Sequence, residues 1–175
     1  RMSPADVDSY VVRGQYQAGR LMGDEVRGYL QEDDVAADSS TETFVALKLF
    51  IDNWRWDGLP VYIRTGKRLA KRVTDIAIQL KEVPSALFGE PVRSEIEPNM
   101  IGLNIQPDEG ISVKFQAKAP GLSYRIQPVR MDFRYGSAFG ESVPEAYERL
   151  LLDALTGDQS LFARGDGVEA TWELV

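Results

Sequence analysis

The stretch MIGLNIQPDEGISVKFQA, residues 100–117, decides the fold of this chain. Two segments rich in apolar and β-branched residues, 100–106 and 111–117, flank the turn-forming run from Pro107 to Gly110. Two such segments joined by a short turn predict a β-hairpin. Because strands joined by short turns pair antiparallel, the sheet that contains this hairpin is expected to be antiparallel.

Further strands are expected on both sides of this hairpin. They are predicted at residues 10–16, 42–52, 60–64, 75–80 and 123–135. The clearest is 75–80, in which Ile76, Ile78 and Leu80 alternate with polar residues and share one face. Segment 42–52 is nearly continuous in apolar residues, which predicts a central strand buried on both faces. A buried helix remains the alternative there, because periodicity cannot separate the two over so short a run.

Helical signals are confined to the last quarter of the chain. Ser142 followed by Glu145 is the pattern of a capping box, which begins a helix. Apolar residues then recur at helical spacing from Tyr147 to Ala154, and Gly157 supplies a stop. One helix with a single apolar face is therefore predicted in this segment.

The remaining segments complete the predicted architecture. Asp166 is expected to cap a second helix over 168–174, residues 85–88 to form a single turn, and 17–40 to form a long loop without apolar period. Strands that come first and helices that come last favour an α+β fold. We expect one domain over residues 1–175, with a large, mainly antiparallel β-sheet and helices packed on one face.

Composition excludes several classes of protein. The chain has 175 residues, 27 acidic against 20 basic, and a net charge of -7. It contains no Cys and no His, which removes a disulfide framework, a thiol nucleophile and the commonest general base near neutral pH. No glycine-rich nucleotide motif, signal peptide or long apolar run is present, so a cytoplasmic protein without membrane insertion is expected.

Five cations lie within nine residues of this acidic chain, where chance would place about one: Arg64, Lys67, Arg68, Lys71 and Arg72. A run of this kind is most often a solvated face that binds nothing in particular. This run is short and follows a predicted strand, which favours a compact anion such as a phosphate ester. A nucleic-acid groove would need a broader basic surface.

Two other candidate sites have weaker support. Trp54 and Trp56 could form a platform on which a sugar stacks, or they could seal the end of a hairpin or an interface. The acidic residues of 24–38 lack the alternating register and distal Glu of a calcium loop, which argues against a metal site.

Five motifs together resemble one protein family. They are RGQY (13–16), DSSTETF (38–44), RWDGLPVYIRTGK (55–67), IQPDEG (105–110) and AYERLLLD (146–153). In this order, and over nearly the whole chain, they are similar to the C-terminal domain of glucose-6-phosphate dehydrogenases. The resemblance implies NADP-dependent oxidation of glucose 6-phosphate to 6-phosphogluconolactone, the entry step of the oxidative pentose phosphate pathway.

The resemblance also implies that the catalytic machinery lies elsewhere in the enzyme. In this family an N-terminal Rossmann domain carries the coenzyme, and the catalytic His lies upstream of the segment that this chain resembles. The absence of His from the chain agrees with this. We expect the isolated polypeptide to supply sugar-phosphate binding and oligomerisation, and to be inactive alone.

Three substrate-binding residues follow from the resemblance. Lys67 and Arg72 match the cations that hold the sugar phosphate, and Gln106 matches a Gln that contacts the substrate. From the residues alone, Gln106 could instead cap its own hairpin. By the same comparison, Arg68 and Lys71 are expected to belong to a solvated face.

Some family members bind a second, structural NADP in this domain. Its matching positions here are Arg64, Lys114, Asp132 and Arg164. Basic or aromatic ligands of that site are replaced at four positions, which are Val73, Ala77, Asn104 and Ser112. Loss of several phosphate-binding cations predicts that this second nucleotide is not held.

The predicted partners are glucose 6-phosphate and further copies of the chain, because the family forms a homodimer or tetramer through its sheet. Nucleic acid and membrane are not expected as partners. The alternative to the enzyme is a non-catalytic assembly or regulatory module whose basic run docks an acidic partner.

Overall fold

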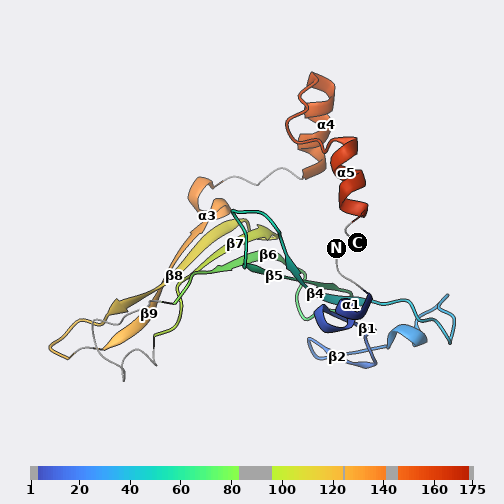
Figure 1. The fold of residues 1–175 in the computed structure, drawn as a ribbon, viewed down its shortest axis with the longest axis horizontal. Helices are drawn as coiled ribbons and strands as arrows, with labels where there is room; N and C mark the ends of the chain where they lie inside the picture. Colours follow the sequence, from blue (N-terminus) through green and yellow to red (C-terminus); the bar gives the residue numbers. More distant parts are fainter. Residues whose placement is uncertain (1–3, 83–95, 124, 141–145, 174–175) are drawn as a thin grey trace. The chain divides into compact units, whose positions relative to one another are not determined.

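The structure is a computed structural model that describes residues 4–82, 96–123, 125–140 and 146–173. The chain divides into two compact units, residues 1–72 and 73–175. Both contain antiparallel sheets, which confirms the predicted α+β class (Figure 1). Each unit is described by itself, and the single domain expected over 1–175 stays a prediction.

The first unit contains a three-stranded sheet in the order β1-β4-β5. Its strands are β1 (Val11–Gly14), β4 (Phe44–Phe50) and β5 (Pro60–Gly66). β4 pairs with both neighbours antiparallel, so the segment predicted as a central strand is confirmed and the helical alternative is wrong. Its side chains are half-buried, apart from the exposed Phe50, so β4 is not buried on both faces as expected.

Two short elements of the first unit differ from the predictions. Helix α1 (Pro4–Tyr10) precedes β1 and includes Tyr10, where the first strand was expected to start. Within the predicted long loop, β2 (Gly19–Leu21) and β3 (Asp24–Val26) form a hairpin, and η1 (Tyr29–Gln31) is a 3-10 turn. These pieces have three to seven residues, too few for an apolar period to emerge.

The second unit contains a four-stranded antiparallel sheet in the order β6-β7-β8-β9. Its strands are β6 (Thr74–Gln79), β7 (Met100–Gln106), β8 (Gly110–Lys118) and β9 (Ile126–Arg134). The pairing of β7 with β8 confirms the hairpin predicted from residues 100–117.

Register gives this sheet one apolar and one polar face. Two cross-strand rows run Ile76, Leu103, Ile111, Phe133 and Ile78, Ile101, Val113, Met131. The alternate positions carry mainly polar or small side chains, among them Gln106, Lys114 and Asp132. The alternation that predicted β6 therefore extends across all four strands.

Three helices follow the last strand of the sheet. α3 (Tyr135–Phe139) contacts β9 through an edge-to-face pair of Phe133 with Phe139, whose ring centroids are 6.4 Å apart. α4 (Ala146–Thr156) and α5 (Gly165–Trp172) confirm the two predicted helices. The expectation that α4 and α5 pack on one face of the sheet stays a prediction.

The helix ends agree with the sequence in part. Gly157 has φ +77°, the left-handed conformation expected of a helix stop. Arg164, not Asp166, precedes the first turn of α5, and Asp166 accepts a hydrogen bond from the Gly167 amide inside that turn. The helix thus begins two residues earlier than expected, and Asp166 lies inside its first turn. The capping box at 142–145 and the turn at 85–88 lie outside the described residues.

Candidate functional site

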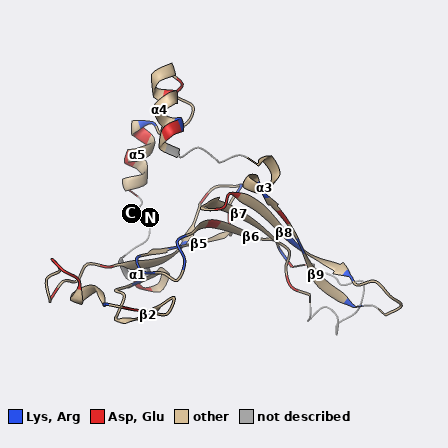
Figure 2. Cartoon of the chain, turned by 180° about the vertical axis from the view of Figure 1, so that it is seen from behind, with Lys and Arg blue, Asp and Glu red and all other residues tan. Residues whose placement is uncertain are grey.

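The basic run lies at the end of β5, where the chain leaves the three-stranded sheet (Figure 2). β5 ends at Gly66, and residues 67–73 form the loop that precedes β6. Lys67, Arg68, Lys71 and Arg72 all lie on this loop. Arg64 lies within the strand, opposite Ala46 of β4.

A hydrogen bond and close packing fix the backbone at Lys67. The amide of Lys67 donates to the carbonyl oxygen of Thr43 at 2.8 Å, which extends the β4–β5 pairing by one residue. A side-chain carbon at Gly66 would lie 2.9 Å from Cδ2 of Phe44 and 3.1 Å from the carbonyl oxygen of Thr43, so a larger residue would force the Phe44 ring to shift. A shallow depression of about 220 Å³ lies between these strand ends, and Lys67 is part of its lining.

Lys67 and Arg72 are exposed, and neither side chain has a bonding partner within the part of the chain that the structure describes. The nearby acidic residue Glu42, which lines the same depression, is bound to Arg13 at 2.9 Å. Two unpaired cations on one short loop suit an anion, because hydrogen bonds from charged donors to phosphate are short and strong.

Gln106 lies at the end of β7 in the second unit. Its Nε2 donates to Oγ1 of Thr74 at 3.0 Å, so the side chain bonds to the neighbouring strand and does not cap its own hairpin. This bond uses the amide nitrogen and leaves the amide oxygen without a described partner. Thr74 is two residues after Arg72 in the sequence.

Arg68 differs from the other cations of the run. Its Nη2 donates to Oε1 of Glu32 at 2.6 Å, and its guanidinium carbon lies 5.8 Å from the centre of the Tyr16 ring. Arg68 is exposed, as expected for a solvated face, but it is bound to a partner far away in the sequence. No sequence signal could have revealed this, because Glu32 is 36 residues away and lies in a segment without apolar period.

The backbone of Arg68 is unusual as well. It has φ +55°, a left-handed conformation that costs a residue with a side chain of order 1 kcal/mol or more. Such a conformation persists only where surrounding contacts determine it. In this structure the contacts of Arg68 with Glu32 and Tyr16 stabilise that conformation.

The contacts of Glu32 lower the pKa of its carboxyl group. The hydrogen bond from Arg68, and then that from the Tyr16 hydroxyl at 3.1 Å, lower the pKa of Glu32 below its ordinary value of 4.5. The same contact with Glu32 raises the pKa of Arg68. Both groups are charged at neutral pH, so the pair is an ion pair there.

This shift predicts a pH dependence of stability. Because folding lowers the pKa of Glu32, the contribution of this carboxylate to stability is fully present at pH values above its ordinary pKa. That contribution is lost as the pH falls through the lowered pKa. In urea unfolding, Glu32→Gln should be less stable than the parent at pH 7, and the gap should close toward pH 3. Glu25→Gln is the control, since its partner Arg20 is 3.5 Å away and exposed. A gap that persists at low pH would contradict the assignment.

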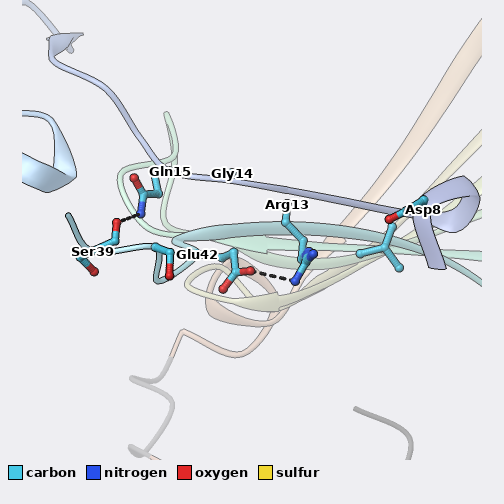
Figure 3. A pocket seen from close by; sticks show the side chains of 8 residues that line it. Asp8, Arg13, Gly14, Gln15, Ser39 and Glu42 are labelled. Carbon is cyan, nitrogen blue, oxygen red and sulfur yellow. Dashed lines mark hydrogen bonds and ion pairs between the residues drawn. The ribbon is translucent and has the colours of Figure 1, made fainter. Parts of the chain in front are cut away.

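The two N-terminal motifs of the family pattern meet at a second depression (Figure 3). Gln15 donates to the carbonyl oxygen of Ser39 at 2.8 Å, and Arg13 pairs with Glu42. The volume is about 470 Å³, but the depression is open, and its principal polar side chains bind one another. Motifs 13–16 and 38–44 therefore hold each other in place here.

The positions matched to a second nucleotide are mostly engaged with neighbours. Lys114 forms an ion pair with Glu97, Asp132 with Arg130 at 2.7 Å, and Arg164 with Asp166 at 2.9 Å. Lys114 and Asp132 share the polar face of β8 and β9 as diagonal neighbours. Arg64 belongs to the other unit.

The two weaker candidates are the tryptophans that follow β4 and the acidic residues of 24–38. Trp54 is almost fully exposed, so it does not seal the hairpin within this chain, and Trp56 stacks with Arg55. Among the described residues, no acidic cluster has the grouping needed to hold a metal ion. No described helix is both long and apolar enough to cross a membrane.

Fold and site together define a chain of the α+β class with antiparallel sheets, in which cations without a described partner follow the end of a strand. The chain matches the family described as glucose-6-phosphate dehydrogenase, C-terminal domain, over residues 1–175. It belongs to that family, as the five motifs indicated.

Relatives and solved structures agree with this assignment. Glucose-6-phosphate 1-dehydrogenase of Chlamydia pneumoniae is 51% identical over 99% of this chain, and that of Aggregatibacter actinomycetemcomitans is 50% identical over 99%. A structure of glucose-6-phosphate dehydrogenase in complex with glucose 6-phosphate has 39% identity and a TM-score of 0.83 over 98% of the chain. The Mycobacterium avium enzyme has 40% identity and a TM-score of 0.75 over 95%. The chain spans about a third of the length of these proteins, 34% for the first three and 33% for the last.

Proposed function

We propose that this chain is the sugar-phosphate-binding part of an enzyme that oxidises D-glucose 6-phosphate to 6-phospho-D-glucono-1,5-lactone with NADP. The observation that carries the proposal is its similarity, at a TM-score of 0.83 and 39% identity, to a dehydrogenase in complex with that substrate. Lys67 and Arg72, which have no partner among the described residues, support it, since a phosphate ester needs charged donors.

In this proposal the ammonium of Lys67 and the guanidinium of Arg72 hold the phosphate of the substrate. Each charge-assisted hydrogen bond contributes on the order of 1.5 to 3 kcal/mol. The amide oxygen of Gln106 accepts a hydrogen bond from a sugar hydroxyl, while its nitrogen stays bound to Thr74. These contacts fix the sugar by its phosphate end, so that C1 is presented to groups elsewhere in the enzyme.

The bound coenzyme would accept the hydride that leaves C1. The relatives are named dehydrogenases, consistent with a nicotinamide coenzyme, and NADP is our specific proposal. Lys114 and Asp132, which match positions for a second, structural NADP, are in ion pairs, and the chain spans about a third of the length of its relatives. We therefore place coenzyme binding outside this chain. No histidine of this chain can act as the base, because it has none.

Self-association and a cytoplasmic location belong to the same proposal. A homodimer or tetramer formed through the sheet is supported by apolar side chains such as Ile76 and Met131, which are 49% and 57% exposed. Nucleic acid is not proposed as a partner, because the net charge of -7 opposes it.

The test is an activity assay on the full-length protein that contains this chain. With glucose 6-phosphate and NADP, we expect absorbance of the reduced coenzyme to rise, and the rate to fall strongly when glucose replaces its phosphate ester. The isolated polypeptide 1–175 should show no turnover. Absence of coenzyme reduction by the full-length protein, with NADP and with NAD, would refute the proposal.

A further inference from the structure

The residue next to Lys67 has a partner, whereas the other cations of the loop have none among the described residues. Arg68 binds Glu32 at 2.6 Å, and its side chain is 41% exposed against 27% for Glu32. Glu32 directly follows η1, and its own amide donates to the Tyr29 carbonyl oxygen at 3.1 Å. A long-range pair of this kind ties the loop after β5 to a segment far away in the sequence.

Tyr16 completes this contact from a third segment. Its hydroxyl donates to the same carboxylate oxygen of Glu32 at 3.1 Å, and its ring lies against the Arg68 guanidinium. Its amide donates to Oγ1 of Thr43 at 3.0 Å, on the residue whose carbonyl oxygen receives the Lys67 amide. Thr43 and the Arg68 pair therefore hold the chain on both sides of the Lys67 side chain.

We propose that the Arg68–Glu32 pair, supported by Tyr16, is a positioning device that sets Lys67 for the phosphate of the substrate. The proposal rests on the proposed function, in which Lys67 binds that phosphate. Glu32 neutralises Arg68 and holds it away from the ligand, so that Arg68 does not compete with Lys67 and Arg72 for the phosphate. Arg68 acts through Lys67 and does not touch the substrate.

An opposite role for Arg68, as a direct phosphate ligand, makes a different prediction. Loss of the carboxylate in Glu32→Gln would free such a ligand and lower the KM for glucose 6-phosphate. If Arg68 is a positioning residue, the same substitution loosens the loop and raises that KM. The sign of the change separates the two roles.

The experiment uses the full-length enzyme and compares KM and kcat for glucose 6-phosphate with the oxidation of unphosphorylated glucose. Arg68→Gly removes the pair but tolerates the φ of +55° without strain. We expect a rise in KM of about fivefold for Arg68→Gly and Glu32→Gln, with kcat and glucose oxidation unchanged. Arg68→Lys should lie between the parent and Arg68→Gly, because it keeps a charge but loses the planar fork.

Two controls isolate the effect. Lys71→Ala removes a cation of the same loop that has no described partner, and should leave KM unchanged. In a Lys67→Ala background, Arg68→Gly should raise KM no further, because residues that act through one contact are not additive.

The outcomes distinguish this inference from the proposed function. If Lys67→Ala raises KM but Arg68→Gly and Glu32→Gln do not, the positioning role is overturned and the phosphate site stands. If Glu32→Gln lowers KM, or if oxidation of glucose falls in parallel, the positioning role is also overturned. If Lys67→Ala itself leaves KM unchanged, both the phosphate site and its positioning are overturned.

Discussion

Substitution of Lys67 by alanine in the full-length enzyme is expected to raise the KM for glucose 6-phosphate by roughly 10- to 100-fold. The variant loses one charge-assisted hydrogen bond of about 1.5 to 3 kcal/mol, and each 1.4 kcal/mol corresponds to a factor of ten. The side chain is exposed and has no described partner, so the folded chain should lose little else.

Steady-state kinetics with varied glucose 6-phosphate measures this effect directly. Lys71→Ala is the matched control, because it removes an equal charge four residues further along the same loop. Competition by inorganic phosphate should weaken in Lys67→Ala and persist in Lys71→Ala. Equal rises of KM in both variants would mean that general loop charge, not Lys67, attracts the substrate.

Substitution of Gly110 by alanine is expected to cause the largest loss of stability among the substitutions considered for this chain. The added carbon would lie 2.3 Å from the carbonyl oxygen of Phe133 and 3.3 Å from Cα of Arg134. Both are backbone atoms of β9, so no side chain can turn aside and the two strands must separate locally. Strain of this kind typically costs about 1 to 3 kcal/mol.

Gly14→Ala is the control for Gly110→Ala. Gly14 also ends a strand, but nothing lies within 4 Å of the position that its side-chain carbon would occupy. We expect a change within about 0.5 kcal/mol for Gly14→Ala, as for an ordinary surface substitution. Urea unfolding followed by circular dichroism measures both variants. Similar midpoints for the two would show that β8 and β9 are not paired as closely as described.

Local patterns were sufficient for the main strands and helices. The turn between Gln106 and Gly110 and the alternation of 75–80 depend on neighbouring residues, and the structure confirms both. The hairpin of β2 with β3 and helix α1 escaped prediction, because elements this short carry too few residues to show a period. Their formation depends on contacts with the rest of the first unit, such as those of α1 with β1 and β4.

The candidate site was predictable to a smaller extent. The density of cations in residues 64–72 pointed to an anion, and the five motifs pointed to Lys67, Arg72 and Gln106. The bond from Gln106 to Thr74 was not predictable, because it forms across two strands 32 residues apart. The roles of these three residues stay predictions until the kinetic tests are made.

The sequence by itself determined that this chain is an acidic α+β protein without cysteine or histidine, with an antiparallel hairpin at 100–117 and a basic loop after a strand. Those features follow from composition and from side chains within a few residues of one another. Only the tertiary structure decided which cation of that loop is bound internally. Arg68 pairs with Glu32 because folding brings the segment after η1 beside the end of β5, and no local pattern encodes that distance.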